Sequence, residues 1–114
     1  MSALAELDRV FHALADPSRL GMVERLCRGP VSVKELAEPL DMALPSVMKH
    51  LGVLEDAGLV RSKKLGRVRT YQIQPAALTS IEKWVARRRD SWNRQFDRLE
   101  QLLLEEDERT DKRR

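Results

Sequence analysis

The chain has 114 residues, the size of one ordinary domain, and 42% of them are apolar, which is enough for a single hydrophobic core. No apolar stretch approaches the roughly 20 residues of a membrane span, and charged residues interrupt the N-terminal region, unlike a signal peptide. The lone cysteine, Cys27, excludes an internal disulfide and predicts a reducing, cytoplasmic location.

The net charge of +3 is unevenly distributed along the chain. Residues 61–74 carry five basic side chains and no acidic one, whereas the residues before them are net acidic. Such a concentrated basic segment is typical of a surface that binds a polyanion. The alternative is a solvated loop, but five like charges in an ordered hairpin would repel one another. The basic residues are Arg61, Lys63, Lys64, Arg67 and Arg69.

The N-terminal half predicts short helices. Residues 3–14 have apolar residues at heptad-like spacing, which predicts an amphipathic helix. Asp16 as N-cap and Pro17 at the first helical position open a second helix, which stops at Arg28-Gly29-Pro30. Ser32 and Glu35 form a capping box that predicts a third, short helix over residues 32–40.

A fourth helix is predicted over residues 44–57. Its end is marked by Ala57-Gly58. Its start is less well marked, because Ala43 is a poor N-cap and Asp41 is an alternative cap.

A hairpin and a long helix complete the chain. Residues 59–65 and 68–73 predict two strands around Leu65-Gly66-Arg67. Pro75 opens a helical segment that reaches about residue 106, and residues 107–114 form a charged tail that we expect to fray. The order predicts a mainly α fold with a small β-hairpin: a winged helix-turn-helix with a long C-terminal helix, forming one domain over residues 1–106.

The helix over residues 44–57 has two distinct sides. Its apolar residues fall on one stripe that should face the core: Leu44, Val47, Leu51 and Leu54. The opposite side is small or compact and includes Gly52, which costs roughly 0.5–1 kcal/mol relative to alanine inside a helix. Two explanations stay open for Gly52: close approach to a DNA backbone, or tight packing on the first helix.

This helix and the basic hairpin together predict DNA binding. A helix with small outward residues can enter the major groove, where Lys49 can reach a phosphate or guanine and Met48 a thymine methyl. Arg67, at the hairpin tip, suits the negative potential of the minor groove. The predicted DNA-binding residues are Pro45, Ser46, Met48, Lys49, His50, Arg61, Lys63, Lys64, Arg67 and Arg69.

Several segments resemble one family. "FHALADPSRLGMVERL", "VSVKELA", "PSVMKHLGVLEDAGLV" and "GRVRTYQI" resemble the ArsR/SmtB family of bacterial winged-helix repressors over about residues 8–74. The segment "RDSWNRQFDRLEQLL" resembles a subgroup without metal-binding cysteines. The resemblance implies a homodimer that binds a palindromic operator in double-stranded DNA and blocks transcription, often of its own operon. It also implies that residues 44–57 are the recognition helix and residues 61–71 the wing.

The metal-binding residues of that family are missing here. Many members bind metal through a Cys-x-Cys pair in the third helix, where this chain has Ala37 and Pro39. Cys27, His12 and His50 are isolated in the sequence, so we expect no metal and no cofactor. Cys27 is interpreted as a small core residue, and His12 as structural or at the edge of a dimer. Many members also carry serine at the positions of Ala43 and Met48.

Catalysis is not predicted, because the chain has no Gly-rich phosphate loop and no nucleophile with an obvious base. A homodimer is predicted from apolar stripes on the first and last helices, with the alternative that both stripes pack within one monomer. The predicted interface residues are Leu4, Leu7, Phe11, Trp92, Phe96, Leu99 and Leu103. Arg87, Arg88 and Arg89 are interpreted as a solvated face, with flanking DNA as the alternative.

The sequence therefore predicts a homodimeric, sequence-specific DNA-binding repressor of its own or a neighbouring operon, not regulated by metal. One alternative is a winged-helix module that binds an acidic protein partner. Another is a repressor whose small-molecule effector lies near Trp84 or Trp92.

Overall fold

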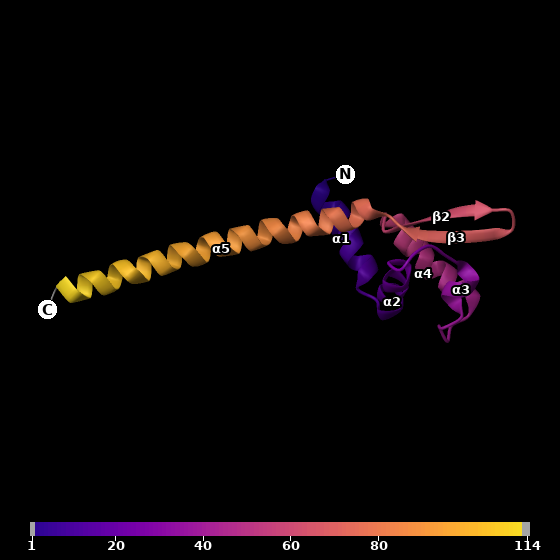
Figure 1. The fold of residues 1–114 in the computed structure, drawn as a ribbon, viewed down its shortest axis with the longest axis horizontal. Helices are drawn as coiled ribbons and strands as arrows, with labels where there is room; N and C mark the ends of the chain where they lie inside the picture. The colour runs from indigo at the N-terminus through magenta and orange to yellow at the C-terminus, as the bar shows by residue number, and fades with distance from the viewer. Residues whose placement is uncertain (1, 113–114) are drawn as a thin grey trace. The chain divides into compact units, whose positions relative to one another are not determined.

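The computed structural model describes residues 2–112 and divides into two compact units, one up to Ser80 and one from Ile81 onward. Figure 1 shows the elements in chain order. The helices are α1 (Ala3–Leu14), α2 (Pro17–Leu26), α3 (Val33–Ala37), α4 (Leu44–Asp56) and α5 (Pro75–Lys112); the strands are β1 (Val31–Ser32), β2 (Val60–Leu65) and β3 (Val68–Ile73). The mainly α fold with a small sheet is confirmed.

Side-chain caps define the starts of the first three helices. Ser2 caps α1, and the side chain of Asp16 accepts a hydrogen bond from the Arg19 backbone N–H at 3.1 Å at the start of α2. Ser32 caps α3 by accepting from the Glu35 N–H at 3.2 Å. Each of these caps satisfies a backbone N–H that the first turn of a helix leaves without a partner. The predicted roles of Asp16, Pro17 and Ser32 are confirmed.

Helix α4 has a weak start and a strong end. Its N-cap is Ala43, which makes no side-chain capping bond, so the alternative cap Asp41 is wrong. At the other end, Gly58 adopts a φ of 78°, which the backbone of glycine tolerates. The Leu59 N–H then donates to Leu54 O at 3.0 Å and the Gly58 N–H to Glu55 O at 2.9 Å, which is a Schellman motif.

The sheet has three strands in the order β1-β3-β2, all antiparallel. Strands β2 and β3 form the predicted hairpin, and Gly66 in its turn has a φ of 61°. Strand β1 was not predicted. It contains two residues, paired as Val31 with Tyr71 and Ser32 with Thr70, and so short a strand shows no alternation in the sequence.

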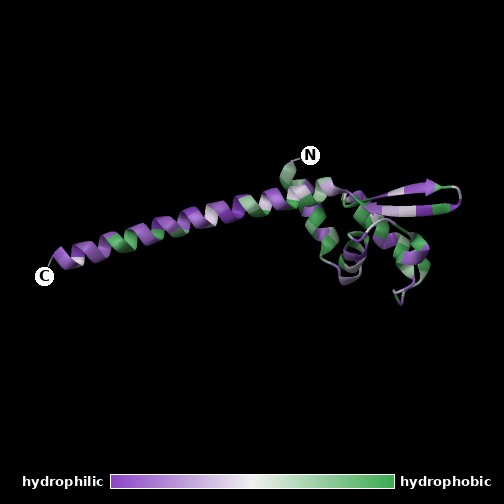
Figure 2. Cartoon of the chain, viewed as in Figure 1, coloured by the Kyte–Doolittle hydropathy of each residue, from purple (hydrophilic) through white to green (hydrophobic). Residues whose placement is uncertain are grey.

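One core joins α1, α2, α3, α4 and the base of the sheet. Figure 2 shows hydrophobic residues gathered in α1–α4 and hydrophilic residues along much of the hairpin. The largest fully buried side chains are Met22, Val47, Leu36, Leu51, Leu54, Leu59 and Val60. Leu7 is also buried, at 6% exposure, so it belongs to this core.

Two burial predictions are wrong. Leu44, expected in the inner stripe of α4, is 54% exposed, because it lies in the first turn of the helix, where the core does not cover it. Cys27, expected in the core, is exposed because it lies at the C-cap of α2, beyond the last buried residue, Leu26.

The second unit is formed by α5 from Ile81 onward. The helix continues to Lys112, beyond the end expected near residue 106. The rings of Trp92 and Phe96 contact each other with centroids 5.6 Å apart, although both residues are more than half exposed. Within residues 2–112, no helix is long and apolar enough to cross a membrane.

Candidate nucleic-acid interface

Helix α4 is held by one buried face and presents the other to solvent. Val47, Leu51 and Leu54 are fully buried. Pro45, Ser46 and Lys49 are exposed on the other side, as the sequence predicted. The anchored face fixes the rotation of the helix about its axis, so these exposed residues have a defined direction.

Gly52 leaves open space beside α4. Apart from its chain neighbours and the backbone of α4 itself, a Cβ atom built at this position meets no heavy atom of residues 2–112 within 4 Å. The packing explanation, in which Gly52 allows α1 to approach closely, is therefore wrong. The structure supplies no internal reason for the helix to carry a glycine here.

His50 is connected to the rest of the domain. Its Nδ1 atom lies 3.3 Å from Arg19 Nη1 and 3.9 Å from Asp16 Oδ2, both on the α2 side of the helix. The Arg19 Nε–H also donates to Ala13 O at 2.7 Å, near the end of α1. Arg19 thus joins α1, α2 and α4. The hydrogen bond from the Arg19 backbone N–H, followed by the charges of Arg19 and His50, lowers the pKa of Asp16.

The two faces of the wing can be separated by the strand register. Cross-strand partners share a face, and successive residues alternate between faces. The face of buried Val60 and Tyr71 also carries Ser62, which donates to Glu55 Oε1 of α4 at 3.2 Å, so this face is directed toward α4. The directly paired Lys64 and Arg69 lie on it too.

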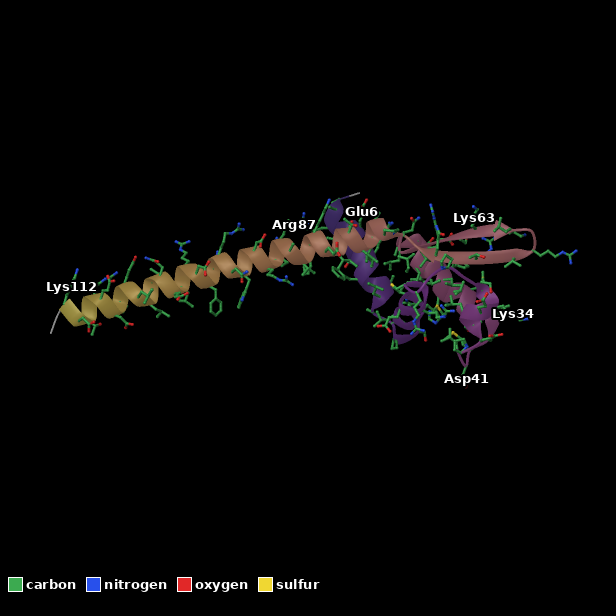
Figure 3. All side chains as sticks on the ribbon, viewed as in Figure 1. Glu6, Lys34, Asp41, Lys63, Arg87 and Lys112 are labelled. Carbon is green, nitrogen blue, oxygen red and sulfur yellow. The ribbon has the colours of Figure 1, made fainter. Side chains whose placement is uncertain are left out.

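Arg61 and Lys63 lie on the opposite face of the wing. Their cross-strand partners are Gln72 and Thr70. Figure 3 labels Lys63 on the side of the hairpin away from α3, where Lys34 is labelled. The five basic residues of the hairpin therefore do not form one surface.

Arg69, near the tip of the wing, also makes a hydrogen bond within the wing. Its Nη1–H donates to Ser62 Oγ at 2.9 Å, and Ser62 in turn donates to Glu55, which links the wing to α4.

The other cations of the wing are less constrained. In the part of the chain that the structure describes, no side-chain hydrogen bond or ion pair is made by Lys63, Lys64 or Arg67. Lys64 and Arg69 are like charges directly across the ladder, a pairing that destabilises a sheet unless an anion lies between them. Burial raises the pKa of the neighbouring Tyr71 hydroxyl.

A groove of 710 Å³ lies between α3, the first turns of α4 and the start of β3. Its apolar lining includes the exposed side chains of Leu44, Met48 and Val68. Three cationic residues, Lys34, Arg67 and Arg69, also line it, against a single acidic residue, Glu38. The groove therefore combines apolar contact area with positive charge.

Sequence reasoning missed Lys34, Leu44 and Val68 as parts of this surface. The three residues come from different elements, and no spacing along the chain relates them. Lys34 had one usable signal, because it lies in the first turn of the helix that precedes the recognition helix.

Among residues 2–112, no group of three or more His, Cys, Asp or Glu side chains is placed to hold a metal ion. His12, on α1, lines a shallow surface depression with Arg9 and Asp56.

Comparisons with known proteins agree with this arrangement. Residues 14–63 match the family model of a helix-turn-helix domain. The chain is 38% identical over 110 residues to the HTH-type transcriptional regulator Rv2034 of Mycobacterium tuberculosis, covering 96% of this chain and 100% of that protein. It is 30% identical over 97 residues to the arsenical resistance operon repressor of Escherichia coli, covering 83% and 80%.

Solved structures give the same result. The crystal structure of an ArsR-family transcriptional regulator aligns with a TM-score of 0.74 at 49% identity, covering 78% of this chain and 92% of the other. A homodimeric winged helix-turn-helix DNA-binding domain from Mycobacterium bovis aligns with a TM-score of 0.62 at 28% identity, covering 73% and 79%. These proteins are transcriptional regulators and not enzymes. This chain therefore belongs to the ArsR family of winged helix-turn-helix transcriptional regulators.

Proposed function

We propose that this regulator is a homodimeric repressor that binds a palindromic operator in double-stranded DNA, upstream of its own or a neighbouring operon. The observation that carries the proposal is a groove lined by the exposed start of α4, at Leu44 and Met48, and by the wing cations Arg67 and Arg69. A basic surface beside an anchored helix with small outward residues fits the width of a major groove and its flanking phosphates.

The two parts of this surface have different tasks. Ser46, Met48 and Lys49 on α4 contact base edges and supply sequence choice. Lys64, Arg67 and Arg69 contact phosphates and supply most of the affinity. The groove between them receives one sugar-phosphate strand, with Lys34 added to the cations and Leu44 and Val68 against the deoxyriboses.

Homodimerisation is supported by the exposed apolar residues of α5 and by the homodimeric M. bovis neighbour. Trp92, Phe96, Leu99 and Leu103 are each more than half exposed. A stripe of this kind is costly in water unless a partner covers it. Leu4 and Phe11 add apolar surface on α1, whereas Leu7 is used in the core of its own chain. A two-fold dimer presents two recognition helices, which matches an inverted repeat.

Regulation by a metal is not part of the proposal. The third helix has Ala37 in place of a thiolate ligand, and soft or borderline metals require several Cys or His ligands.

The test is selection of binding sites from random duplex DNA by the purified protein, followed by mapping of the selected site upstream of genes. We expect an inverted repeat with half-sites about one helical turn, or a multiple of one turn, apart. If no sequence is enriched, and the affinity for DNA changes with salt concentration but not with sequence, sequence-specific recognition is overturned. That result would favour a module that binds acidic surfaces.

A further inference from the structure

His50 lies on the flank of α4 opposite the groove. At about 100° per residue, it is about 200° around the helix from Met48, which lines the groove. It is also one turn from Ser46, which is exposed. The His50 side chain is 22% exposed, and its ring contacts Arg19 of α2. His50 therefore stands at the edge of the exposed side of α4, next to α2.

Arg19 is fixed by hydrogen bonds to the end of α1. Its Nε–H donates to Ala13 O at 2.7 Å, and its Nη2–H donates to His12 O at 3.4 Å. The two bonds hold the plane of the guanidinium group, so the remaining nitrogen, Nη1, has a defined position 3.3 Å from His50 Nδ1. A planar group that is already held at two points loses little conformational freedom when it binds a third.

The contact with Arg19 decides which nitrogen of His50 carries the proton. A guanidinium group has only donors, so His50 Nδ1 must accept in this bond and carries no proton. Asp16 Oδ2 lies 3.9 Å from the same Nδ1, beyond hydrogen-bonding distance, and it already accepts from the Arg19 backbone N–H at 3.1 Å. The proton of the neutral His50 ring is therefore on Nε2.

The Nε2–H of His50 has no acceptor among residues 2–112, where the polar contacts of the ring are those of Nδ1 with Arg19 and Asp16. The two nitrogens of an imidazole ring point away from each other, so Nε2 is directed away from Arg19. A helix in the major groove has a phosphate backbone on each side. The cations that line the groove lie on one of these sides, and His50 lies on the other.

We propose that His50 Nε2–H donates a hydrogen bond to a phosphate of the DNA strand on the α2 side of α4. Arg19 is then a positioning residue, because it fixes the orientation and the tautomer of the His50 ring without contacting DNA. This inference rests on the proposed binding of DNA by α4 and adds a phosphate contact opposite the wing. One DNA strand is held by the wing cations and the other by His50.

The positions of the protons on the His50 ring test the tautomer in the free protein. The experiment records imidazole nitrogen shifts of the 15N-labelled full chain, and His50→Gln distinguishes the signals of His50 from those of His12. At about pH 8, where an ordinary imidazole is neutral, we expect an unprotonated Nδ1 and a protonated Nε2. In Arg19→Ala both shifts should move toward those of a free imidazole. A protonated Nδ1, or protons on both nitrogens, would overturn the proposal.

Two substitutions of His50 test the phosphate contact. His50→Gln places an amide N–H near the position of Nε2, whereas His50→Asn places it near the position of Nδ1. We expect His50→Asn to raise the Kd for duplex DNA roughly tenfold and His50→Gln to raise it less than about threefold. A neutral donor releases no counterion, so neither variant should change the slope of log K against log salt.

The same titrations use a mixed-sequence duplex and the duplex selected by the protein. Because a phosphate carries no sequence information, His50→Asn should weaken binding to both by the same factor. Equal Kd values for His50→Asn and His50→Gln would overturn the proposal. So would an effect confined to the selected duplex, which indicates a base contact, or a slope reduced by about one unit, which indicates a charged ring.

A double substitution tests whether Arg19 acts through His50. Arg19→Ala should raise the DNA Kd roughly tenfold in the wild-type chain but less than about twofold in the His50→Asn chain. Arg19→Lys keeps the charge but has one nitrogen in place of three, so it should act like Arg19→Ala. Arg25→Ala is the control, because it removes a charge from the same helix and should leave the Kd near the wild-type value. Additive effects of Arg19→Ala and His50→Asn would show that Arg19 does not act through His50.

The outcomes separate this inference from the proposed function. If a sequence is selected but His50→Asn binds both duplexes like wild type, the phosphate contact is rejected and the proposed function stands. If no sequence is selected but the His50 variants differ as expected, the sequence-specific repressor is rejected and the phosphate contact stands. Circular dichroism shows whether each variant is folded. If the Arg19 variants are unfolded, the wild-type ring shifts and the two His50 variants decide.

Discussion

Gly52 lowers the stability of α4, although no contact with another element among residues 2–112 requires a glycine there. A glycine within a helix costs roughly 0.5–1 kcal/mol relative to alanine. Apart from its chain neighbours and the backbone of α4, an added Cβ atom would meet nothing among residues 2–112 within 4 Å. The space beside Gly52 is therefore open, and close approach of DNA fits the proposed role of α4.

Gly52→Ala should have opposite effects on protein stability and on DNA binding. We expect the free energy of unfolding to rise by about 0.5–1 kcal/mol, since alanine removes the glycine penalty, while operator affinity falls because the methyl group occupies the space used by DNA. Denaturant unfolding and operator titration measure the two effects. Gly21→Ala is the matched control, because Gly21 lies in α2 and its added Cβ also meets nothing within 4 Å. It should raise stability without changing affinity. Equal affinities for the two variants would contradict the role of Gly52.

A second prediction for a single residue concerns Asp16 and the dependence of stability on pH. Its pKa is lowered in the folded protein, chiefly by the hydrogen bond from the Arg19 N–H. A lowered carboxyl pKa means that the stabilisation is present above the unfolded-state pKa and is lost as pH falls through the folded-state pKa. Asp16→Ala should therefore lower the melting temperature at pH 7 and have much less effect near pH 3. Asp41→Ala is the control, because Asp41 caps no helix. If Asp16→Ala lowers the melting temperature equally at pH 7 and near pH 3, the carboxylate charge of Asp16 is not the source of the stabilisation.

At the scale of elements, the wing is a strand pair with two unequal faces. Lys64 and Arg69 lie on the face directed toward α4, and Arg61 and Lys63 lie on the other. Hydrogen bonds from Arg69 to Ser62 and from Ser62 to Glu55 link the wing to α4. We therefore expect α4 and the α4-directed face of the wing to approach DNA as one surface.

Two adjacent lysines test this asymmetry. Lys64→Ala should reduce the slope of log K against log salt by about one unit, because it removes one phosphate contact on the α4-directed face. Lys63→Ala should change the slope less, although both side chains are exposed and neither is paired within residues 2–112. Operator titrations over a range of salt concentrations measure both slopes. Equal slopes for the two variants would show that the register does not decide which cations contact DNA.

At the scale of the whole molecule, the proposed activity depends on two copies of the chain. The apolar residues of α5 between Trp92 and Leu103 are more than half exposed, and the rings of Trp92 and Phe96 already contact each other. A single copy presents one recognition helix, whereas an inverted repeat requires two. We therefore expect dimerisation and operator affinity to be lost together.

Phe96→Glu should produce a monomer, because it places a charge in the centre of the apolar stripe, where desolvation without a partner is costly. Sedimentation equilibrium measures the mass, and operator titration should show a parallel loss of affinity. Gln101→Glu adds the same charge on the opposite side of the helix and should leave the dimer intact. A dimer that persists in Phe96→Glu would place the interface elsewhere.

Most of the local structure could be predicted from neighbouring residues. Asp16, Ser32 and Gly58 act on backbone groups within a few residues, so their roles as helix caps and stops could be predicted without the fold. The basic hairpin was predicted for the same reason, because alternation and a turn glycine are properties of neighbouring residues. The exposed side of α4 was predicted from the phase of its apolar stripe, and Pro45, Ser46 and Lys49 are indeed exposed.

Contacts between residues far apart in the sequence could not be predicted and depend on the fold. The fold paired β1 with β3, joined His50 to Arg19, and divided the wing cations between two faces. It also left Leu44 exposed, since helical phase predicts a direction but not whether another element covers it. Sequence periodicity describes one element at a time, whereas burial and the groove of the candidate site arise from contacts between elements.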